Sequence, residues 1–136
     1  MSRLITLFCC AVGIMYLFLG VWCAISPDKT SGIVGFELIG GSGKSEFITV
    51  YGGLEIGMAM ILILPIIHQR FLEYSLLACL LIHVNLVLFR TLSFICYSEI
   101  SSGTYKLAIG EWFIFLLSLI LYWKLRNFNK AKLISA

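Results

Sequence analysis

The chain has 136 residues, of which 60% are hydrophobic and 12% are charged, with a mean hydropathy of +1.00. Soluble domains contain roughly 45–50% apolar and about 25% charged residues, so this is the composition of a membrane protein. The length allows about four spans of roughly 20 residues with short connections and excludes a separate soluble domain. The formal net charge is only +3, and we expect no nucleic-acid partner.

Four apolar runs predict an all-α integral-membrane four-helix bundle. We expect a single transmembrane domain over residues 1–136, with spans at about residues 4–25, 47–67, 74–96 and 107–123. The first run follows Arg3 and so resembles a secretory signal peptide, but it is longer than the usual apolar region of one. Trp22 and Cys23 are also poor neighbours for a small-residue cleavage site. We therefore interpret this run as a retained helix that ends before Pro27.

The longest connection, residues 28–45, is rich in Gly and Ser. Its apolar part, residues 33–39, predicts a short strand or a stretch lying along the membrane interface. The sequence GGSGKS at residues 40–45 ends like a phosphate-binding loop. That motif requires a glycine five residues before Gly43, where this chain has Leu38. We therefore expect a flexible turn here and no nucleotide site.

The basic residues predict the orientation, because cytoplasmic loops of membrane proteins carry an excess of Lys and Arg. One side of the predicted bundle carries the larger set, namely Arg3, Arg70, Lys124, Arg126, Lys130 and Lys132. The other side carries only Lys29, Lys44 and Lys106. Both termini are therefore expected in the cytoplasm, with the Gly-rich connection outside.

Three charged residues, Glu55, Arg90 and Glu111, lie inside the predicted spans. At 1.5 Å per residue, all three fall in the outer half of the bilayer. An isolated charge near the centre of a spanning helix costs about 2.5–3.5 kcal/mol on insertion scales, so mutual pairing is the cheapest remedy. We expect Arg90 to be held between the two carboxylates.

Two neighbours extend this cluster. His83 lies about 20° from the face of Arg90, and Tyr51 precedes Glu55 by one turn, where its hydroxyl could donate to the carboxylate. One Arg against two Glu leaves one carboxylate to be balanced by a shared proton, by His83 or by a bound cation. The cluster either only fixes helix register or lines a cavity, open to the outer leaflet, that handles an amphiphile head group or a proton. Ionisable residues inside a membrane favour the functional interpretation.

Three glycines of the second span, Gly52, Gly53 and Gly57, predict close helix packing. On a regular helix Gly53 and Gly57 lie about 40° apart, and Glu55 points to the opposite side. We expect this glycine face to support a homo-oligomer.

The five cysteines lie in or beside apolar runs, and we expect them to be small buried hydrophobes. A disulfide between Cys23 and Cys96 is an alternative, because both lie near the same side of the predicted bundle. There is no CxxC motif and no His or acidic companion to Cys9 and Cys10, so no metal site is expected.

Short motifs carry a family resemblance, namely YGGLEIG at residues 51–57, Phe89-Arg90 and Gly110-Glu111-Trp112. Through them the chain resembles a family of small four-helix proteins of the bacterial inner membrane, which is classified only as a domain of unknown function. The resemblance extends over nearly the whole chain. It implies a four-helix protein of the bacterial inner membrane, suggests a homotrimer, and implies a part in the upkeep of the Gram-negative envelope. The positions shared with the family motif are Tyr51, Gly52, Gly53, Glu55, Arg90 and Glu111.

The leading hypothesis is a non-enzymatic envelope protein that binds a lipid or other amphiphile at the Glu55–Arg90–Glu111 cluster and supports membrane integrity or drug tolerance. The alternatives are a proton-coupled transporter of small molecules and a structural membrane oligomer without a ligand. An integral-membrane enzyme like the trimeric glutathione-dependent family is disfavoured, because no basic inner-face cluster is available for a thiol cofactor. We expect no cofactor.

Overall fold

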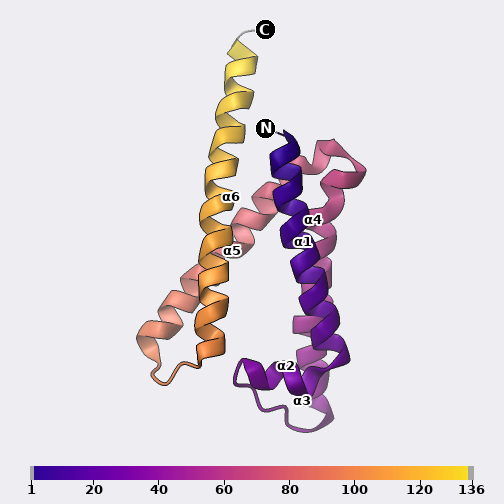
Figure 1. The fold of residues 1–136 in the computed structure, drawn as a ribbon, viewed down its shortest axis with the longest axis vertical. Helices are drawn as coiled ribbons and strands as arrows, with labels where there is room; N and C mark the ends of the chain where they lie inside the picture. Colours follow the sequence, from indigo (N-terminus) through magenta and orange to yellow (C-terminus); the bar gives the residue numbers. More distant parts are fainter. Residues whose placement is uncertain (1, 135–136) are drawn as a thin grey trace.

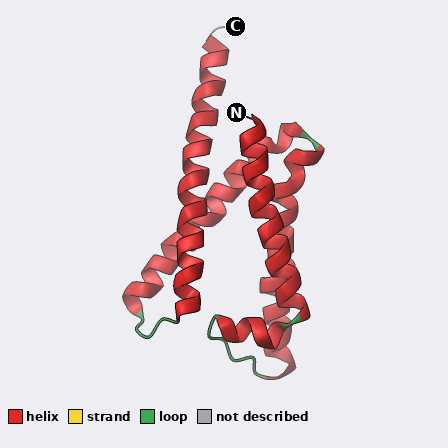
Figure 2. Cartoon of the chain, viewed as in Figure 1, coloured by secondary structure: helices red, strands yellow, loops and turns green. Residues whose placement is uncertain are grey.

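The computed structural model describes residues 2–134, and within that range every regular element is a helix (Figures 1 and 2). In chain order the elements are α1 (Ser2–Ile25), α2 (Pro27–Ile33), α3 (Gly40–Phe47), the π-helix η1 (Ile48–Leu54), α4 (Glu55–Ile67), the 3₁₀-helix η2 (Gln69–Phe71), α5 (Leu72–Cys96) and α6 (Ser102–Ile134).

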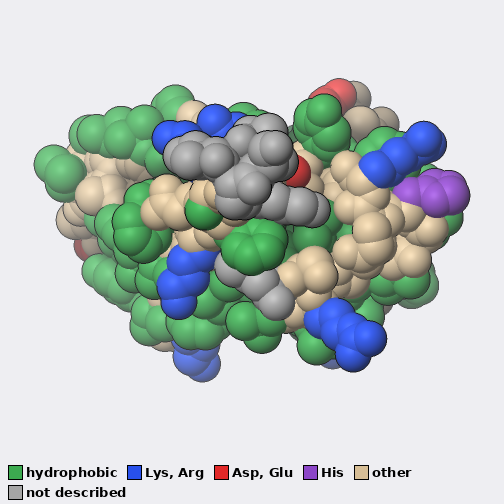
Figure 3. Space-filling model, turned by 90° about the horizontal axis from the view of Figure 1, so that it is seen from above, with side chains coloured by type: hydrophobic (Ala, Val, Ile, Leu, Met, Phe, Trp, Pro, Cys, Tyr) green, Lys and Arg blue, Asp and Glu red, His purple; other side chains and the backbone are tan. Residues whose placement is uncertain are grey.

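Four continuous helical stretches are long and apolar enough to cross a membrane, namely Ser2–Ile25, Gly40–Ile67, Gln69–Cys96 and Ser102–Ala131. The protein is therefore a multi-pass helical membrane protein, and the predicted all-α fold with four spans is confirmed. Both termini lie at one end of the bundle, while α2 and α3 lie at the other (Figure 1). Seen from the terminal end, Lys and Arg side chains are spread around the rim of the bundle (Figure 3).

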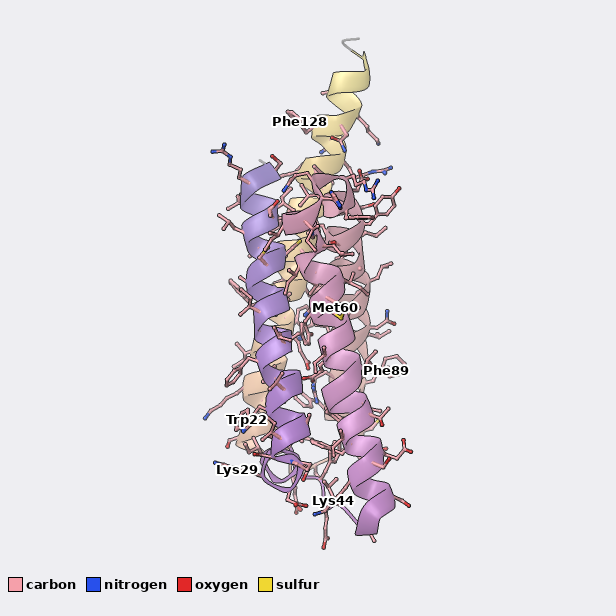
Figure 4. All side chains as sticks on the ribbon, turned by 90° about the vertical axis from the view of Figure 1, so that its right-hand side faces the viewer. Trp22, Lys29, Lys44, Met60, Phe89 and Phe128 are labelled. Carbon is pink, nitrogen blue, oxygen red and sulfur yellow. The ribbon has the colours of Figure 1, made fainter. Side chains whose placement is uncertain are left out.

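The outer surface is apolar over the middle of the bundle. Met60 and Phe89 lie there, and both are about two-thirds exposed (Figure 4). Trp22, Lys29 and Lys44 lie at the α2–α3 end in the same view. Because aromatic and basic residues anchor the ends of spanning helices, this distribution is typical of a chain surrounded by lipid.

The long connection is more helical than predicted. The expected flexible turn at residues 40–45 is the first part of α3. Of the expected strand or interfacial stretch at residues 33–39, Ile33 ends α2 and residues 34–39 form a turn and an irregular segment, with no strand. Helix α2 was not predicted. Pro27 occupies its first position, where a missing N–H costs nothing, and the Thr30 hydroxyl donates to the Ser26 carbonyl at 2.9 Å. Gly40 has a φ of +61°, a left-handed conformation that suits glycine and turns the chain into α3.

Helix α6 also differs from its prediction. It continues to Ile134, well beyond the expected end of the span at residue 123, and projects past the other helices at the terminal end (Figure 1). Residues 124–134 contain neither Gly nor Pro and several good helix formers, so nothing in them stops the helix.

Helix α1 packs closely along α4 and η1 because glycines remove side chains from the contact. A Cβ on Gly20 would lie 2.9 Å from the backbone oxygen of Gly52, and one on Gly13 would lie 2.8 Å from Ile63. By contrast, a Cβ on Gly53 or Gly57 would meet nothing within 4 Å. Of the three predicted packing glycines, only Gly52 packs within the chain.

The second span also contains a π-helix, η1, that the sequence did not predict. Its wider turn adds residues to the helix, so positions on the two sides of η1 no longer follow a regular period of 3.6 residues. Such insertions are frequent at functional sites, and here η1 ends directly before Glu55.

Two buried clusters hold the bundle together. The first joins α1, α5 and α6 near the termini through Ile5, Cys9, Leu72, Leu76, Leu121 and Leu125. The second joins α1, α4, α5 and α6 nearer the middle through Val12, Tyr16, Ala59, Leu62, Cys79 and Ile114. Beyond this level the α1–α4 pair and the α5–α6 pair diverge toward α2 (Figure 1). The bundle is thus densely packed at the terminal end and divided at the other.

The cysteine predictions are met in part. Cys9, Cys10 and Cys79 are buried as expected, while Cys23 is half-buried and Cys96 is exposed. All five are free thiols, so the alternative disulfide between Cys23 and Cys96 is wrong.

We predict that Gly20→Ala destabilises the fold by about 1–3 kcal/mol, because its Cβ would force apart the backbones of α1 and η1. Thermal unfolding followed by circular dichroism in detergent measures the effect. Gly41→Ala in α3 is the matched control, since a Cβ there meets nothing within 4 Å. Equal stability of the two variants would contradict the assigned packing.

Candidate functional site: a polar cavity between two helix pairs

A cavity of about 770 Å³ lies between the α1–α4 pair and the α5–α6 pair. Apolar side chains form most of its wall, including Met15, Leu19, Met58, Leu86 and Ile114. Its ionisable and phenolic lining consists of Tyr16, Cys23, Tyr51, Glu55, His83, Arg90, Lys106 and Glu111. The structure therefore brings together all five residues of the predicted charge cluster, from three separate spans.

Arg90 and Glu111 form a two-pronged ion pair between α5 and α6. The Nε of Arg90 donates to Oε2 of Glu111 at 3.0 Å, and its Nη2 donates to Oε1 at 2.6 Å. The two side chains are 27% and 13% exposed, respectively. Such paired charge-assisted hydrogen bonds are among the strongest available to proteins. The predicted pairing of Arg90 with Glu111 is therefore present.

The predicted pairing of Arg90 with Glu55 is wrong. Among the residues that the structure describes, no cation lies within ion-pair distance of Glu55 and no group donates a hydrogen bond to it. Its Oε2 is buried without a partner. Since one carboxylate already binds the guanidinium on two nitrogens, the second carboxylate remains on the opposite wall, at the start of α4.

Tyr51 does not donate to Glu55 as predicted. Its ring stacks on Phe47 with centroids 4.7 Å apart and meets Phe36 edge-on at 5.6 Å. The sequence spacing was compatible with the hydrogen bond, but the aromatic contacts of α3 and the wider turn of η1 place the ring elsewhere.

His83 is fully buried at the inner end of the cavity and has two hydrogen-bond partners. Its Nδ1 lies 2.8 Å from the Cys79 carbonyl, and its Nε2 lies 3.0 Å from the Tyr16 hydroxyl. A carbonyl can only accept, so Nδ1 carries the proton and Nε2 accepts from Tyr16. Both ring nitrogens thus have partners inside the bundle, and the imidazole makes no hydrogen bond to Glu55.

Sequence reasoning missed Tyr16 and Lys106. Tyr16 supplies the hydrogen bond between α1 and α5, and its signal was a lone phenol in the middle of an apolar span. Lys106 was counted only as a basic residue of the outer side, yet it lines the cavity from the first turns of α6. No salt bridge involves Lys106 within the described residues.

The charges of the cavity wall balance. Glu55 and Glu111 are acidic, Arg90 and Lys106 are basic, and no further Asp, Glu, Lys or Arg lines the cavity. One acid and one base neutralise each other directly, while Glu55 and Lys106 each lack a partner in the described part of the chain. The cavity thus offers one free acceptor and one free cation inside a mostly apolar wall.

No cluster of His, Cys, Asp and Glu in the described residues has the arrangement of a metal site. Comparisons with protein-family models, with curated proteins and with solved structures gave no match to this chain.

We predict that Glu111→Gln costs about 3–5 kcal/mol of stability, because it leaves the Arg90 guanidinium partly buried without its counter-ion. Chemical or thermal unfolding in detergent measures the loss. The double variant Arg90→Leu/Glu111→Leu should be more stable than Glu111→Gln alone, since it removes both charges. A double variant less stable than the single one would show that the pair does not act as described.

We predict that Tyr16→Phe costs about 1–3 kcal/mol, because it leaves the Nε2 of His83 buried without a donor. Tyr105→Phe is the matched control, since the Tyr105 ring is half exposed. Unfolding of both variants under the same detergent conditions provides the comparison. The hydrogen-bond assignment fails if the two substitutions have the same effect.

Proposed function

We propose that this chain is a small protein of the bacterial inner membrane that binds a membrane lipid or other amphiphile in the cavity and has no enzymatic activity. In that role it would support envelope integrity or drug tolerance, as the family resemblance implies. One observation carries the proposal: an apolar cavity between two helix pairs also contains an unpaired carboxylate and an unpaired cation. A ligand that matches this wall has an apolar part and a polar part.

The size of the cavity supports this class of ligand. Small-molecule sites in proteins commonly measure about 300–1,000 Å³, and the volume here is about 770 Å³. That space accommodates a head group together with part of an acyl chain. Its wall of Leu, Met, Ile and Phe side chains would exchange contacts with water for contacts with hydrocarbon.

The position of the cavity suggests how a lipid enters. Helix α1 packs on α4 and η1, helix α6 packs on α5, and both α1 and α6 line the cavity. We infer that the ligand enters between α1 and α6 from the surrounding leaflet. With the termini in the cytoplasm, this is the outer leaflet.

A proton-coupled transporter has less support. Such a protein needs a path to both sides of the membrane, whereas the terminal half of the bundle is filled by the buried cluster around Ile5, Leu76 and Leu121. No residue of that cluster lines the cavity.

We also propose self-association, with a trimer as the state that the resemblance suggests. Gly53 and Gly57 have open space at their Cβ positions, so the backbone of η1 and α4 is accessible to another copy.

We predict that Gly110→Phe reduces the lipid that remains bound to the purified protein in native mass spectrometry at least about fivefold. Gly110 lines the cavity and has no neighbour within 4 Å of its Cβ position, so the new ring fills the site. Ile109→Phe is the control, because Ile109 is 71% exposed and lies outside the cavity. Equal lipid retention in the two variants would contradict binding in the cavity.

A further inference from the structure

Resting on the proposed lipid-binding function, we propose that the cavity selects a zwitterionic phospholipid whose head group carries a primary amine. The ammonium group binds the carboxylate of Glu55, and the phosphate lies between Arg90 and Lys106.

Glu55 lacks a hydrogen-bond donor in the described part of the chain. Its carboxylate lines the cavity, its Oε2 is buried, and no group in the described residues donates to it. A buried carboxylate without donors is strongly disfavoured, so a ligand that brings N–H groups gains more here than at a satisfied site. The terminal torsion of a Glu side chain is broad and two-fold, so either oxygen can turn toward the ligand.

Arg90 has N–H groups that its ion pair does not use. A guanidinium has five N–H groups, and Glu111 accepts from Nε and Nη2. Three N–H groups of Arg90, which lines the cavity, are therefore left for another acceptor. Lys106 lines the same cavity and has no ion-pair partner in the part of the chain that the structure describes. A phosphate suits this pair, because its several oxygens accept from both cations.

The charge balance of the cavity wall favours a zwitterion. The four charged groups of the wall sum to zero, so a zwitterion leaves the site neutral and gives each unpaired group a partner. An anionic lipid such as phosphatidylglycerol would satisfy the cations but leave Glu55 without a counter-charge. A purely cationic amphiphile would pair with Glu55 but leave Lys106 without a counter-charge. An unpaired carboxylate inside a membrane is costly, so an anionic lipid fits less well, and a purely cationic amphiphile brings no acceptor to Arg90 and Lys106.

A primary ammonium and a quaternary ammonium are recognised by different protein groups. A quaternary ammonium has no N–H to donate and is recognised instead by the faces of surrounding aromatic rings. Tyr16, Trp22, Phe47 and Tyr51 line the cavity, and Phe47 and Tyr51 each have one face occupied by their mutual stacking. A quaternary ammonium on such rings would leave the Oε2 of Glu55 without a donor, whereas a primary ammonium supplies one.

The test is a competition among four phospholipids with the same acyl chains: phosphatidylethanolamine, its N-methyl and N,N-dimethyl forms, and phosphatidylcholine. Their head-group charges are equal, while the N–H groups on nitrogen fall from three to none. Phosphatidylglycerol is the anionic comparison. Each lipid is added to delipidated protein, and the bound fraction is measured by native mass spectrometry for the unaltered chain, for Glu55→Gln, and for Glu46→Gln as an exposed control on the same span.

We expect phosphatidylethanolamine to bind about tenfold more tightly than phosphatidylcholine, with the methylated forms between them, which corresponds to one charge-assisted hydrogen bond. Glu55→Gln should abolish this order and Glu46→Gln should keep it. Equal binding of all five lipids, or a preference for phosphatidylglycerol or phosphatidylcholine, overturns the inference while lipid binding stands. Absence of any bound lipid overturns the proposed function itself. If Glu55→Gln does not fold, the order within the methylation series of the unaltered chain still decides.

Discussion

The ion pair between Arg90 and Glu111 determines the character of the site. A guanidinium inside a membrane needs a counter-ion, and Glu111 supplies it through two hydrogen bonds from the neighbouring helix. Because this pairing is complete with one carboxylate, Glu55 is left on the opposite wall without a donor. The interaction therefore does two things at once: it joins α5 to α6, and it leaves an acidic group facing a cavity whose other free charge is Lys106.

The packing of the helices explains why a cavity exists beside that pair. Gly13, Gly20 and Gly52 let α1 lie directly against η1 and α4, so these elements form one tight unit. The buried apolar clusters join this unit to α5 and α6 only toward the terminal end and the middle. The Tyr16–His83 hydrogen bond lies at the boundary between the second buried cluster and the cavity. A rigid base with two diverging helix pairs is an arrangement that can admit a lipid without unfolding.

Much of this could be predicted from the sequence, because hydropathy and the cost of buried charge act on the chain locally. The four spans and the gathering of Glu55, His83, Arg90 and Glu111 followed from those two rules. The choice of Glu111 over Glu55 could not be predicted, since it depends on side-chain geometry between helices. The π-helix η1 could not be predicted, because a π-helix is not visible in a hydropathy pattern. Helix α2 was missed because Gly and Ser in residues 28–45 favoured a loop.

The most direct test of a lipid-filled cavity is photo-crosslinking in membranes with a phosphatidylethanolamine that carries a photoreactive acyl chain. Peptide mapping then identifies the labelled residues. The account predicts adducts on residues of the cavity wall such as Met58 and Leu86, in addition to outward-facing residues such as Met60 and Phe113. Labelling confined to the outward-facing residues, with none on the cavity wall, would show that the cavity does not take up lipid and would contradict the central claim.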